Sequence, residues 1–453
     1  MGGFFCGFEG KYIMNREIER PIVAKFGGSS LADAGRIERV AEIVYANPNR
    51  RHIVVSAPGK RFSNDEKITD LLFRCSSLAK QGLPFDKAFE TISQRYEDIG
   101  KGLRCHSSVV GWLHNVHEGI RQNEGKDWIA SRGEWMMAQI FARFLGGSFV
   151  DAAKLIKFKK DGQIDPLSYD LIKYQLAAGS MYHVIPGFYG TSVSGKIQIF
   201  ARGGSDITGA IIARGVNASV YENWTDVDGL LAADPRLVDN PKVIREITYR
   251  EMRELGYRGA DVLQRDAVLP VFEANIPIHI RNTFNPTSPG SFIRKERQLR
   301  REEGVIGIAG KSGFVAIQIE KFGMNEITGI GSKILDILRD SEVSFEQLPM
   351  GLDGISVILR EAELNGKEEK LIQAIRLAIE PTNIGMIKNL GVVCLVGEGI
   401  RQKASSIDFS NALNSADINI QAVSYSMSGN NITIAIKGDE VQKAIKVLYD
   451  RFI

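Results

Sequence analysis

The sequence has 453 residues, which predicts two or three domains, and its formal net charge is only +3. This near balance of charge argues against nucleic acid or an anionic membrane surface as the main partner. The hydrophobic share of 44% is typical of a globular protein, and no apolar run reaches the length of a membrane-spanning helix. The four cysteines lack CxxC spacing, which disfavours a disulfide scaffold or a zinc site and fits a reducing cytoplasm.

Residues 1–20 are interpreted as an N-terminal tail, because they have neither helical periodicity nor the apolar core of a signal peptide. From residue 21 to residue 297, short apolar strands alternate with amphipathic helices, which predicts an α/β domain with a parallel sheet covered on both faces. The strands are expected at 21–26, 52–56, 149–150, 182–185, 219–222 and 277–280.

The sequence changes character after residue 297. The charge run at 298–303 is expected to be a solvated linker. The sequence then predicts two copies of a βαββαβ unit, at 304–380 and at 385–453. Residues 342–348 of the first copy align with residues 417–423 of the second. Strands are expected at 313–320, 343–348, 355–359, 392–396, 418–423 and 431–437. This repeat has no catalytic constellation, so we expect it to sense a ligand or bind a partner.

Several familiar catalytic and metal-site patterns do not occur in the sequence. The six histidines have no metal-ligand spacing with acids or thiols, and there is no nucleophile-elbow or Cys–His signature. Residues 190–196 (GTSVSGK) almost match a P-loop, but Ile197 replaces the required Ser or Thr, and a strand follows where a P-loop needs a helix. We therefore expect a hairpin turn there.

Two glycine pairs are more informative, because each follows a cation. Lys25 is followed by Gly27-Gly28-Ser29 at an expected helix start, which would offer N–H groups, a helix N-terminus and a cation to one anion. Arg202 precedes Gly203-Gly204-Ser205-Asp206 and a helix in the same way. The alternative, that the glycines serve only turns with positive φ, stays open. Together the pairs predict two anion sites that face each other.

Further polar clusters fit the same chemistry. Residues 131–134 (SRGE) are expected to open a helix, where the carboxylate would cap the helix or hold a substrate ammonium. Residues 223–229 and 233–236 form a polar loop after a strand, the position at which α/β sheets bind ligands. A site rich in Lys, Arg and N–H donors suits phosphoryl transfer, because that chemistry depends on positioning and charge neutralisation.

These motifs resemble those of the aspartate kinases, within the amino-acid kinase superfamily. Residues 25–30 (KFGGSS) look like the KFGG(T/S)S start of that family, and the blocks at 131–134, 202–206, 224–227 and 233–236 follow in the family's order. The C-terminal repeat resembles the family's paired ACT domains. The resemblance implies a three-layer αβα sandwich followed by two ferredoxin-like ACT domains, without the homoserine dehydrogenase extension of bifunctional relatives.

The resemblance also implies ATP-dependent phosphorylation of the β-carboxylate of L-aspartate to 4-phospho-L-aspartate, the first step towards lysine, threonine and methionine. A carboxylate is already ionised at neutral pH, so no general base is needed. Lys25 would neutralise the transferring phosphoryl group, and Asp206 would orient Lys25. Glu134 would hold the α-ammonium of aspartate, and Arg202 would pair with its α-carboxylate.

By the same resemblance, further residues line the two substrate pockets. The aspartate pocket would include Ser56, Thr69, Phe188 and Ser205. The nucleotide contacts would be Lys25, Gly27, Gly28, Ser29, Thr225, Asp226, Leu231 and Arg236. Magnesium would be carried mainly by the phosphates of ATP, so no protein ligand of a metal is expected.

Two positions depart from the family pattern. Residues 259–265 read GADVLQR where many relatives carry a GAKVLHP-like block whose lysine reaches the nucleotide, and Leu231 stands where others stack a Tyr. These departures motivate one alternative, a catalytically weakened sensor that binds amino acids without turnover. A kinase for another amino-acid carboxylate, such as glutamate, is the other alternative, although such relatives generally lack an ACT pair.

The ACT pair implies feedback regulation by an amino acid, with lysine as the first expected effector and threonine as the next. The matching loop and strand run from Met324 to Ile330 and from residue 345 to residue 354, and Glu346 would meet the effector's ammonium. The alternative for Glu346 is an exposed strand carboxylate without a ligand. A homodimer or a dimer of dimers through the ACT domains follows from the same resemblance.

Overall fold

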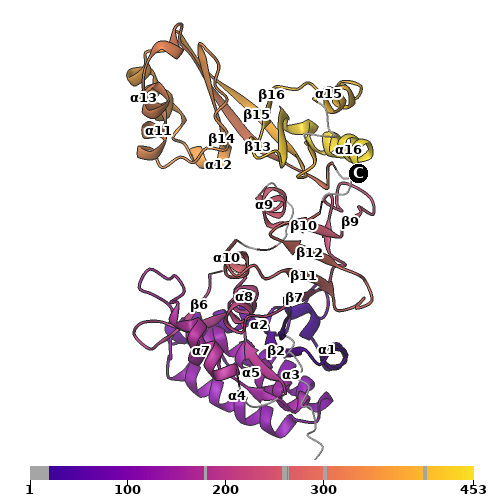
Figure 1. The fold of residues 1–453 in the computed structure, drawn as a ribbon. Helices are drawn as coiled ribbons and strands as arrows, with labels where there is room; N and C mark the ends of the chain where they lie inside the picture. Colours follow the sequence, from indigo (N-terminus) through magenta and orange to yellow (C-terminus); the bar gives the residue numbers. More distant parts are fainter. Residues whose placement is uncertain are drawn as a thin grey trace, which may run out of the picture. The chain divides into compact units, whose positions relative to one another are not determined.

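The computed structural model describes residues 20–177, 181–201, 203–257, 263, 265–298, 304–400 and 406–453. Residues 1–19 of the expected tail and 299–303 of the expected linker lie outside these ranges. The chain divides into two compact units, one containing residues up to 226 together with 269–278, and the other containing 227–268 together with 279–453 (Figure 1). Among the described residues, every helix is too short or too polar to cross a membrane.

The first unit is built on parallel strands in the order β7-β1-β2-β4-β3. Their bounds are β1 (Ile22–Phe26), β2 (Arg50–Val55), β3 (Ser148–Phe149), β4 (His183–Pro186) and β7 (Val220–Thr225). All residues of β1 and β4 are buried, as expected for a parallel sheet covered on both faces. The predicted α/β class with a mostly parallel sheet is confirmed.

Helices cover both faces of these strands (Figure 1). One face shares its core with α1 (Ala34–Tyr45), α2 (Ile68–Lys80), α3 (Asp86–Gly102), α4 (His106–Arg121) and α5 (Lys126–Leu145). The other face carries α8 (Gly204–Gly215), beside α7 (Leu167–Leu176) and the short α6 (Ala152–Leu155). Because side chains alternate along a strand, Ala24 and Phe26 enter the first core, whereas Lys25 faces α8.

Residues 189–199 form an antiparallel hairpin of β5 (Tyr189–Thr191) and β6 (Ile197–Ile199). The N–H of Ser192 donates to the carbonyl of Lys196, and Gly195 takes φ +77° in the turn. The near-match to a P-loop is therefore a hairpin turn, as the strand after it predicted.

The second unit starts with short strands and one helix. They are β8 (Leu230–Leu231), β9 (Val243–Ile244), β10 (Glu246–Thr248), α9 (Tyr249–Tyr257), β11 (Ile278–Asn282) and β12 (Ser291–Arg294). Strands β10, β12 and β11 lie side by side in that order, and β8 pairs with β9. Helix α10 (Arg265–Glu273) precedes β11 in the chain.

The remainder of the second unit is an antiparallel sheet with the order β14-β13-β15-β17-β16 among the described residues. Its strands are β13 (Gly307–Glu320), β14 (Gly354–Arg360), β15 (Asn383–Val396), β16 (Ala422–Tyr425) and β17 (Asn431–Lys437). Its helices are α11 (Ile330–Asp340), α12 (Glu361–Leu364), α13 (Glu368–Ile379), α15 (Ser406–Asn414) and α16 (Val441–Phe452).

The long strands β13 and β15 run through both halves of this sheet, so the two predicted repeats share it. Helices α11 and α13 build the core of one half, and α15 and α16 build the core of the other. Each half thus covers its part of the sheet with a pair of helices, the layering of a ferredoxin-like unit.

Two expected strands of the repeat differ from the structure. Residues 343–348 form no strand, because the N–H groups of Glu346 and Gln347 both donate to the carbonyl of Ile358, which interrupts a regular ladder. The strand expected at 418–423 begins only at Ala422, because the N–H of Ile418 is used by the carbonyl of Leu413 at the end of α15. Both differences arise from contacts that the hydrophobic pattern does not encode.

Candidate active site

The C-terminal ends of neighbouring parallel strands lie in register in the first unit. Phe26, Val55, Pro186 and Trp224 are aligned across β1, β2, β4 and β7. The residues that follow these positions therefore meet at one edge of the sheet, which is where α/β sheets bind ligands. Four expected site segments start there, namely Gly27–Ser29, Ser56, Phe188 and Thr225–Asp226.

Lys25 lies just before this edge, with its side chain buried on the α8 face of β1. Its Nζ is 2.5 Å from Oδ1 of Asp206 and donates to Oδ1 of Asn223 at 3.3 Å. Nδ2 of Asn223 donates to the same Oδ1 of Asp206 at 2.9 Å, which closes a triangle of contacts. An ammonium has three N–H donors, so these two contacts with described residues leave one donor for a ligand.

Asn223 was not singled out from the sequence as an individual site residue. It is the direct neighbour of Lys25 across β1 and β7. The signal that could have found it is the strand register, which places residues of one face side by side in a parallel sheet.

The turn after β1 is the 3₁₀ helix η1 (Gly28–Leu31), so a helix starts at the glycine pair as expected, although it is a 3₁₀ helix. Helix α1 begins only at Ala34, where the side chain of Asp33 accepts a hydrogen bond from the backbone and caps it. Gly27 has φ −73°, so a positive φ does not explain this residue. The first N–H groups of a short helix still have no partner inside it, which keeps the turn suited to an anion.

Gly28 is required by the close approach of two loops. A Cβ at Gly28 would lie 2.8 Å from the carbonyl oxygen of Ala57, and one at Gly59 would lie 2.5 Å from the carbonyl carbon of Gly28. The N–H of Gly59 donates to the carbonyl of Gly28 at 2.8 Å. The loop after β2 therefore holds the turn after β1 in place.

The second glycine pair lies at the N-terminus of α8. Gly203 takes φ +60° and precedes the first helical residue, so the expected role of a positive-φ turn applies to this glycine. Ser205 and Asp206 occupy the first turn of α8, where the helix dipole favours an anion. Arg202 lies outside the described residues, so its contact with a substrate carboxylate stays a prediction.

Phe188 has φ +80°, an unusual backbone conformation for an aromatic residue. Its N–H donates to Oγ1 of Thr208 at 3.1 Å, and its carbonyl accepts from the N–H of Phe200 at 2.9 Å. Gly204 leaves room for it, because a Cβ there would lie 2.6 Å from the Phe188 ring. A strained conformation that several contacts maintain is typical of a ligand site.

Glu134 lies in the interior of α5, and the expectation that its block opens a helix is wrong. Oγ of Ser131 bonds back to the carbonyl of Trp128 within the helix instead of capping a helix start. Burial raises the pKa of Glu134 to about 7, although a hydrogen bond from the backbone N–H of Ala57 opposes this shift. Its Oε2 has no hydrogen-bond partner among the described residues, which suits an ammonium supplied by a ligand.

Ser56 and Thr69 lie at the end of β2 and in α2, two elements that contact α5, the helix of Glu134. Ser56 follows β2, and its N–H donates to the carbonyl of Phe26 at 3.2 Å. Thr69 is the second residue of α2, next to Ile68, whose side chain packs beside Gly133 of α5. Both side chains are half-buried, so a ligand at the sheet edge can reach them.

Thr225 and Asp226 follow the buried part of β7. Oγ1 of Thr225 donates to Oδ1 of Asp226 at 3.2 Å. Trp224 is a core residue, because its ring stacks on Phe26 and its Nε1 donates to Glu222 at 2.8 Å. Trp224 therefore supports the strand from within the core.

Leu231 and Arg236 belong to the second unit. Leu231 is half-buried in β8, and the exposed Arg236 is paired to Asp234 with an N–O distance of 2.5 Å. Hydrogen bonds from Arg236 lower the pKa of Asp234. The variant block at 259–265 lies mostly outside the described residues, so its missing lysine is a fact of the sequence alone.

The expected regulatory residues lie on the antiparallel sheet unit. The side chains of Met324 and Ile330 are buried in the core that α11 and α13 build. The N–H of Met324 donates to the carbonyl of Lys321, and its carbonyl accepts from the N–H of Ile327. Glu346 is not an exposed carboxylate. Its side chain is 7% exposed, and its Oε1 lies 2.8 Å from Nε of Arg360.

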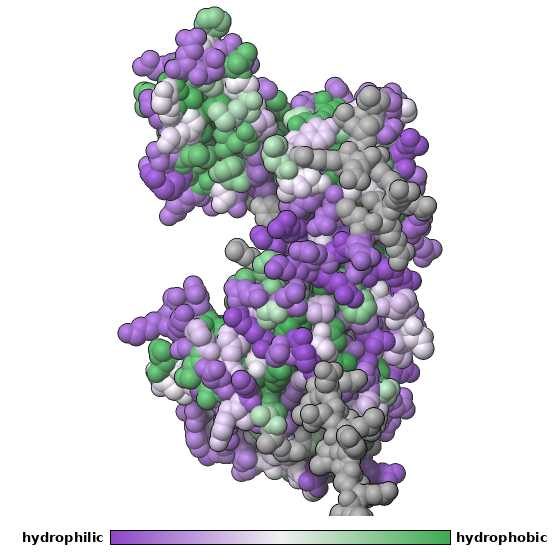
Figure 2. Space-filling view, viewed as in Figure 1, coloured by the Kyte–Doolittle hydropathy of each residue, from purple (hydrophilic) through white to green (hydrophobic). Residues whose placement is uncertain are grey.

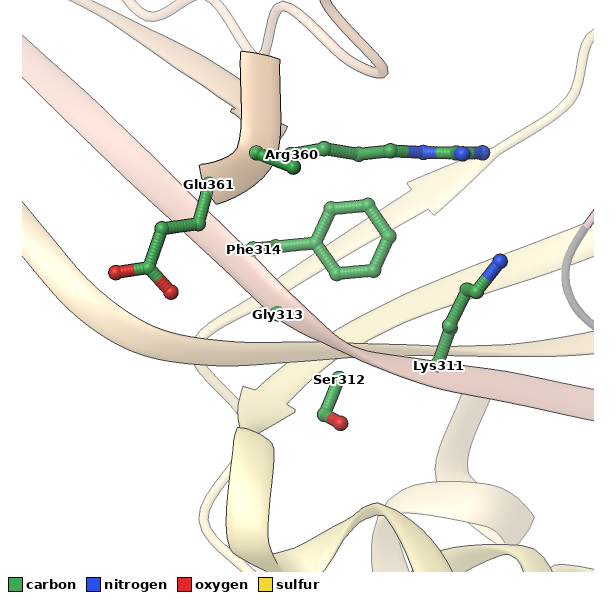
Figure 3. Close-up of a pocket in the computed structure, with 7 residues that line it drawn as sticks. Lys311, Ser312, Gly313, Phe314, Arg360 and Glu361 are labelled. Atoms are coloured by element: carbon green, nitrogen blue, oxygen red, sulfur yellow. The ribbon is translucent and has the colours of Figure 1, made fainter. Parts of the chain in front are cut away.

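Cavities open on both ends of β14. One, of about 310 Å³, is lined by residues of β13 and β14 and by residues 349–351, within the segment in which the resemblance places an effector. The other, of about 450 Å³, lies beside the bulge at Gly313. Figure 3 shows Lys311 and Arg360 extending to one side of this cavity and Glu361 to the other, with Phe314 between them.

Comparison with protein-family models matches residues 20–282 to the amino acid kinase family and residues 393–452 to an ACT domain. The chain is 35% identical over 449 residues to aspartokinase 3 of Bacillus subtilis, which covers 95% of this chain and 98% of that protein. The chain belongs to the aspartokinases. The expected amino-acid kinase fold with a C-terminal ACT region is thereby confirmed.

Solved aspartokinase structures agree with this assignment. The crystal structure of Clostridium acetobutylicum aspartate kinase superposes with a TM-score of 0.89 at 42% identity, covering 95% of this chain and all of that one. E. coli aspartokinase III in complex with aspartate and ADP superposes with a TM-score of 0.70 over 95% of this chain and 99% of that one. At 22% identity the E. coli protein supports the aspartokinase fold alone.

Proposed function

We propose that the chain transfers the γ-phosphoryl group of ATP to the β-carboxylate of L-aspartate, giving 4-phospho-L-aspartate and ADP. The observation that carries this proposal is the contact of Lys25 with Asp206 and Asn223, beside the N–H-rich turn at the edge of the parallel sheet. Residues 21–297 are the proposed catalytic domain, and 304–380 and 385–453 are the proposed ACT domains.

The chemical difficulty of the reaction is the approach of one anion to another. The acceptor carboxylate is ionised near neutral pH, so the protein has to supply positive charge and position. Lys25 supplies the charge, and Asp206 and Asn223 hold its ammonium in place. The turn after β1 and the N-terminus of α8 add backbone N–H donors.

Aspartate is proposed to bind with its α-ammonium on Glu134, because the buried Oε2 lacks a donor that an ammonium would provide. A bound cation favours the ionised carboxylate and would lower the pKa of Glu134 from about 7. Arg202 is proposed to pair with the α-carboxylate. The other proposed contacts of aspartate are Ser56, Thr69, Phe188 and Ser205.

The phosphates of ATP are proposed to lie on Gly27, Gly28 and Ser29, where no side chain of Gly28 obstructs the backbone. Thr225, Asp226, Leu231 and Arg236 are the proposed contacts of the rest of the nucleotide. Magnesium bound to the phosphates would neutralise part of their charge. The task of this chain's residues is to orient the phosphates, and no protein ligand of magnesium is proposed.

A free amino acid is proposed to regulate the rate through the ACT region, with lysine as the first candidate and threonine as the second. Glu346 is the proposed contact of the effector's ammonium, with Met324 and Ile330 in the adjoining segment. Because Glu346 is paired with Arg360, the ammonium of the effector would have to replace the Arg360 guanidinium on the carboxylate. Saturating lysine and threonine should change the rate or the affinity for aspartate, and the absence of any effect would refute this regulation.

Self-association through the ACT region, as a homodimer or a dimer of dimers, is also proposed. Phe322, Ile327, Met350 and Leu352 are exposed on two loops joined by a hydrogen bond from the N–H of Asn325 to the carbonyl of Leu352. Figure 2 shows that hydrophobic residues also gather on the visible face of the lobe with β13, β14 and β15. Exposed clusters of this kind mark interfaces, so Leu352→Glu should lower the mass measured by light scattering. An unchanged mass would count against self-association through this surface.

The experiment that tests the enzymatic proposal traps the acyl phosphate with hydroxylamine. The protein is incubated with MgATP and hydroxylamine together with aspartate, glutamate or no acceptor. Hydroxamate that requires aspartate is the expected result. Hydroxamate that forms with glutamate but not with aspartate would favour a kinase for another amino-acid carboxylate. No hydroxamate with either acid would favour a sensor without turnover.

A further inference from the structure

Arg95 is a deeply buried arginine of α3 whose hydrogen bonds lead to the loop after β2. Its Nη1 donates to the carbonyl of Gly59 at 3.0 Å, and its Nη2 donates to Oδ1 of Asp65 at 2.6 Å. The residue is only 2% exposed. Burial of a guanidinium is costly even when it is paired, so its place in the interior needs a reason.

Asp65 collects the hydrogen bonds that fold this loop. Oδ2 accepts from the backbone N–H of Arg61 at 3.0 Å and from its Nε at 2.9 Å, and Oδ1 also accepts from the N–H of Glu66. Burial opposes ionisation of Asp65, but the hydrogen bonds from Arg61 and the charges of Arg95 and Arg61 together lower its pKa to about 2. The loop is therefore closed around a carboxylate that stays ionised at neutral pH.

The loop in turn fixes the turn after β1. The N–H of Gly59 donates to the carbonyl of Gly28, and the two glycines are too close to admit a Cβ on either. Arg36 of α1 fastens the same two segments, with Nη1 donating to the carbonyl of Ser29 at 2.9 Å and Nη2 to the carbonyl of Arg61 at 3.2 Å. Two arginines from two helices thus hold the loop and the turn together.

One feature of Arg95 does not serve stability. Its Nε is buried and has no hydrogen-bond acceptor within the part of the chain that the structure describes. An unpaired buried donor costs free energy, which the bonds of the same guanidinium to Gly59 and Asp65 offset. An apolar side chain at this position could not form the hydrogen bonds to Gly59 and Asp65.

We infer that Arg95 and Asp65 are positioning residues for phosphoryl transfer. Through Gly59 they set the position of Gly27–Ser29, the turn on which the phosphates of ATP are proposed to lie, and the inference rests on that proposed function. Neither residue is among the proposed contacts of aspartate or ATP. A displacement of the turn on the ångström scale would misplace the phosphate relative to Lys25, which is sufficient to slow transfer.

Arg95→Met removes both hydrogen bonds at a similar side-chain length, and Arg95→Lys keeps the charge with a single anchoring group. We expect Arg95→Met to lower kcat/KM for ATP by about 10²-fold, with Arg95→Lys between it and the wild type. The KM for aspartate should change less, because Glu134 is carried by α5 and not by this loop. Asp65→Asn, which keeps the shape of the side chain, should give the same split if Arg95→Met does not fold.

Arg50 offers a matched control in the same unit. It is another buried arginine, paired to Glu222 at 2.7 Å and bonded to the carbonyl of Ile43, but it starts β2 at the end away from the site. Arg50→Met should lower the unfolding midpoint and leave kcat/KM for ATP unchanged. An unchanged kcat/KM in the Arg95 and Asp65 variants, or an equal loss in Arg50→Met, would overturn the inference. Aspartate-dependent turnover by the wild type tests the proposed function separately.

Discussion

Glu251 and Arg297 form a bidentate ion pair in which both side chains are almost completely buried. Nε and Nη2 of Arg297 lie 3.0 and 2.8 Å from the two carboxylate oxygens. The same carboxylate accepts the N–H groups of Thr248 and Glu398, each at 2.8 Å. Thr248 and Glu251 also form a capping box at the start of α9, because Oγ1 of Thr248 accepts the N–H of Glu251. Segments of the second unit that are distant in sequence therefore depend on one carboxylate.

Glu251→Gln leaves the guanidinium of Arg297 buried without its counter-charge. We expect the free energy of unfolding to fall by about 3–5 kcal/mol, the usual result of breaking a buried pair. Denaturant titration measures this loss. Arg294→Gln is the control, because its pair with Glu246 is exposed and should be worth at most about 1 kcal/mol. Equal losses of unfolding free energy in the two variants would show that the buried pair of Glu251 and Arg297 stabilises the protein no more than an exposed pair does.

Glu134→Gln should change how stability depends on pH. Burial raises the pKa of Glu134 from its ordinary value of 4.5 to about 7 in the folded protein. The protonated form therefore favours folding, and this stabilising effect is lost as pH rises through 7. Between about pH 5 and pH 8 the wild type should therefore lose roughly 3 kcal/mol of folding free energy relative to Glu134→Gln. Thermal unfolding at both pH values measures the difference.

The same variant should raise the KM for aspartate, because the amide cannot pair with an α-ammonium. Glu90→Gln, at an exposed position of α3, is the control and should follow the wild type in both measurements. Parallel stability curves for the wild type and Glu134→Gln would mean that the carboxyl is not held neutral by burial.

Gly28→Ala tests the contact between the two loops. The new Cβ would meet the carbonyl oxygen of Ala57 at 2.8 Å and the N of Gly59 at 3.1 Å, and neither backbone group can move freely. We expect a loss of about 1–3 kcal/mol in stability, together with a higher KM for ATP. Gly111→Ala, in open space on α4, should instead stabilise the protein by about 0.5–1 kcal/mol. A neutral Gly28→Ala would contradict the packing described for the turn.

The sequence predicted the fold best where hydrophobic periodicity determines the structure. Strand β17 has the bounds expected from its apolar pattern, and β14 exceeds its expected range by one residue at each end. The pattern failed at residues 343–348, where a shared carbonyl of Ile358 prevents a regular ladder. It failed also at residues 131–134, because a polar block inside a buried helix looks like a helix start.

The candidate site was predictable in its residues but less so in its geometry. Lys25 and Asp206 stand out beside their glycine pairs, and the structure places them in contact. Asn223 joins them only through the register of β1 and β7, which no local pattern reveals. The role of Gly28 depends on the approach of Gly59, which is equally invisible in the sequence.

Lys25 is the residue proposed to supply the charge for transfer of a phosphoryl group to aspartate. The most direct test is the rate of aspartate-dependent hydroxamate formation by the wild type and by Lys25→Met, with circular dichroism to check the fold. We expect product from the wild type and a loss of about 10³-fold in Lys25→Met with an unchanged spectrum. A wild-type rate in Lys25→Met, or a wild type that forms no hydroxamate with aspartate, would contradict it.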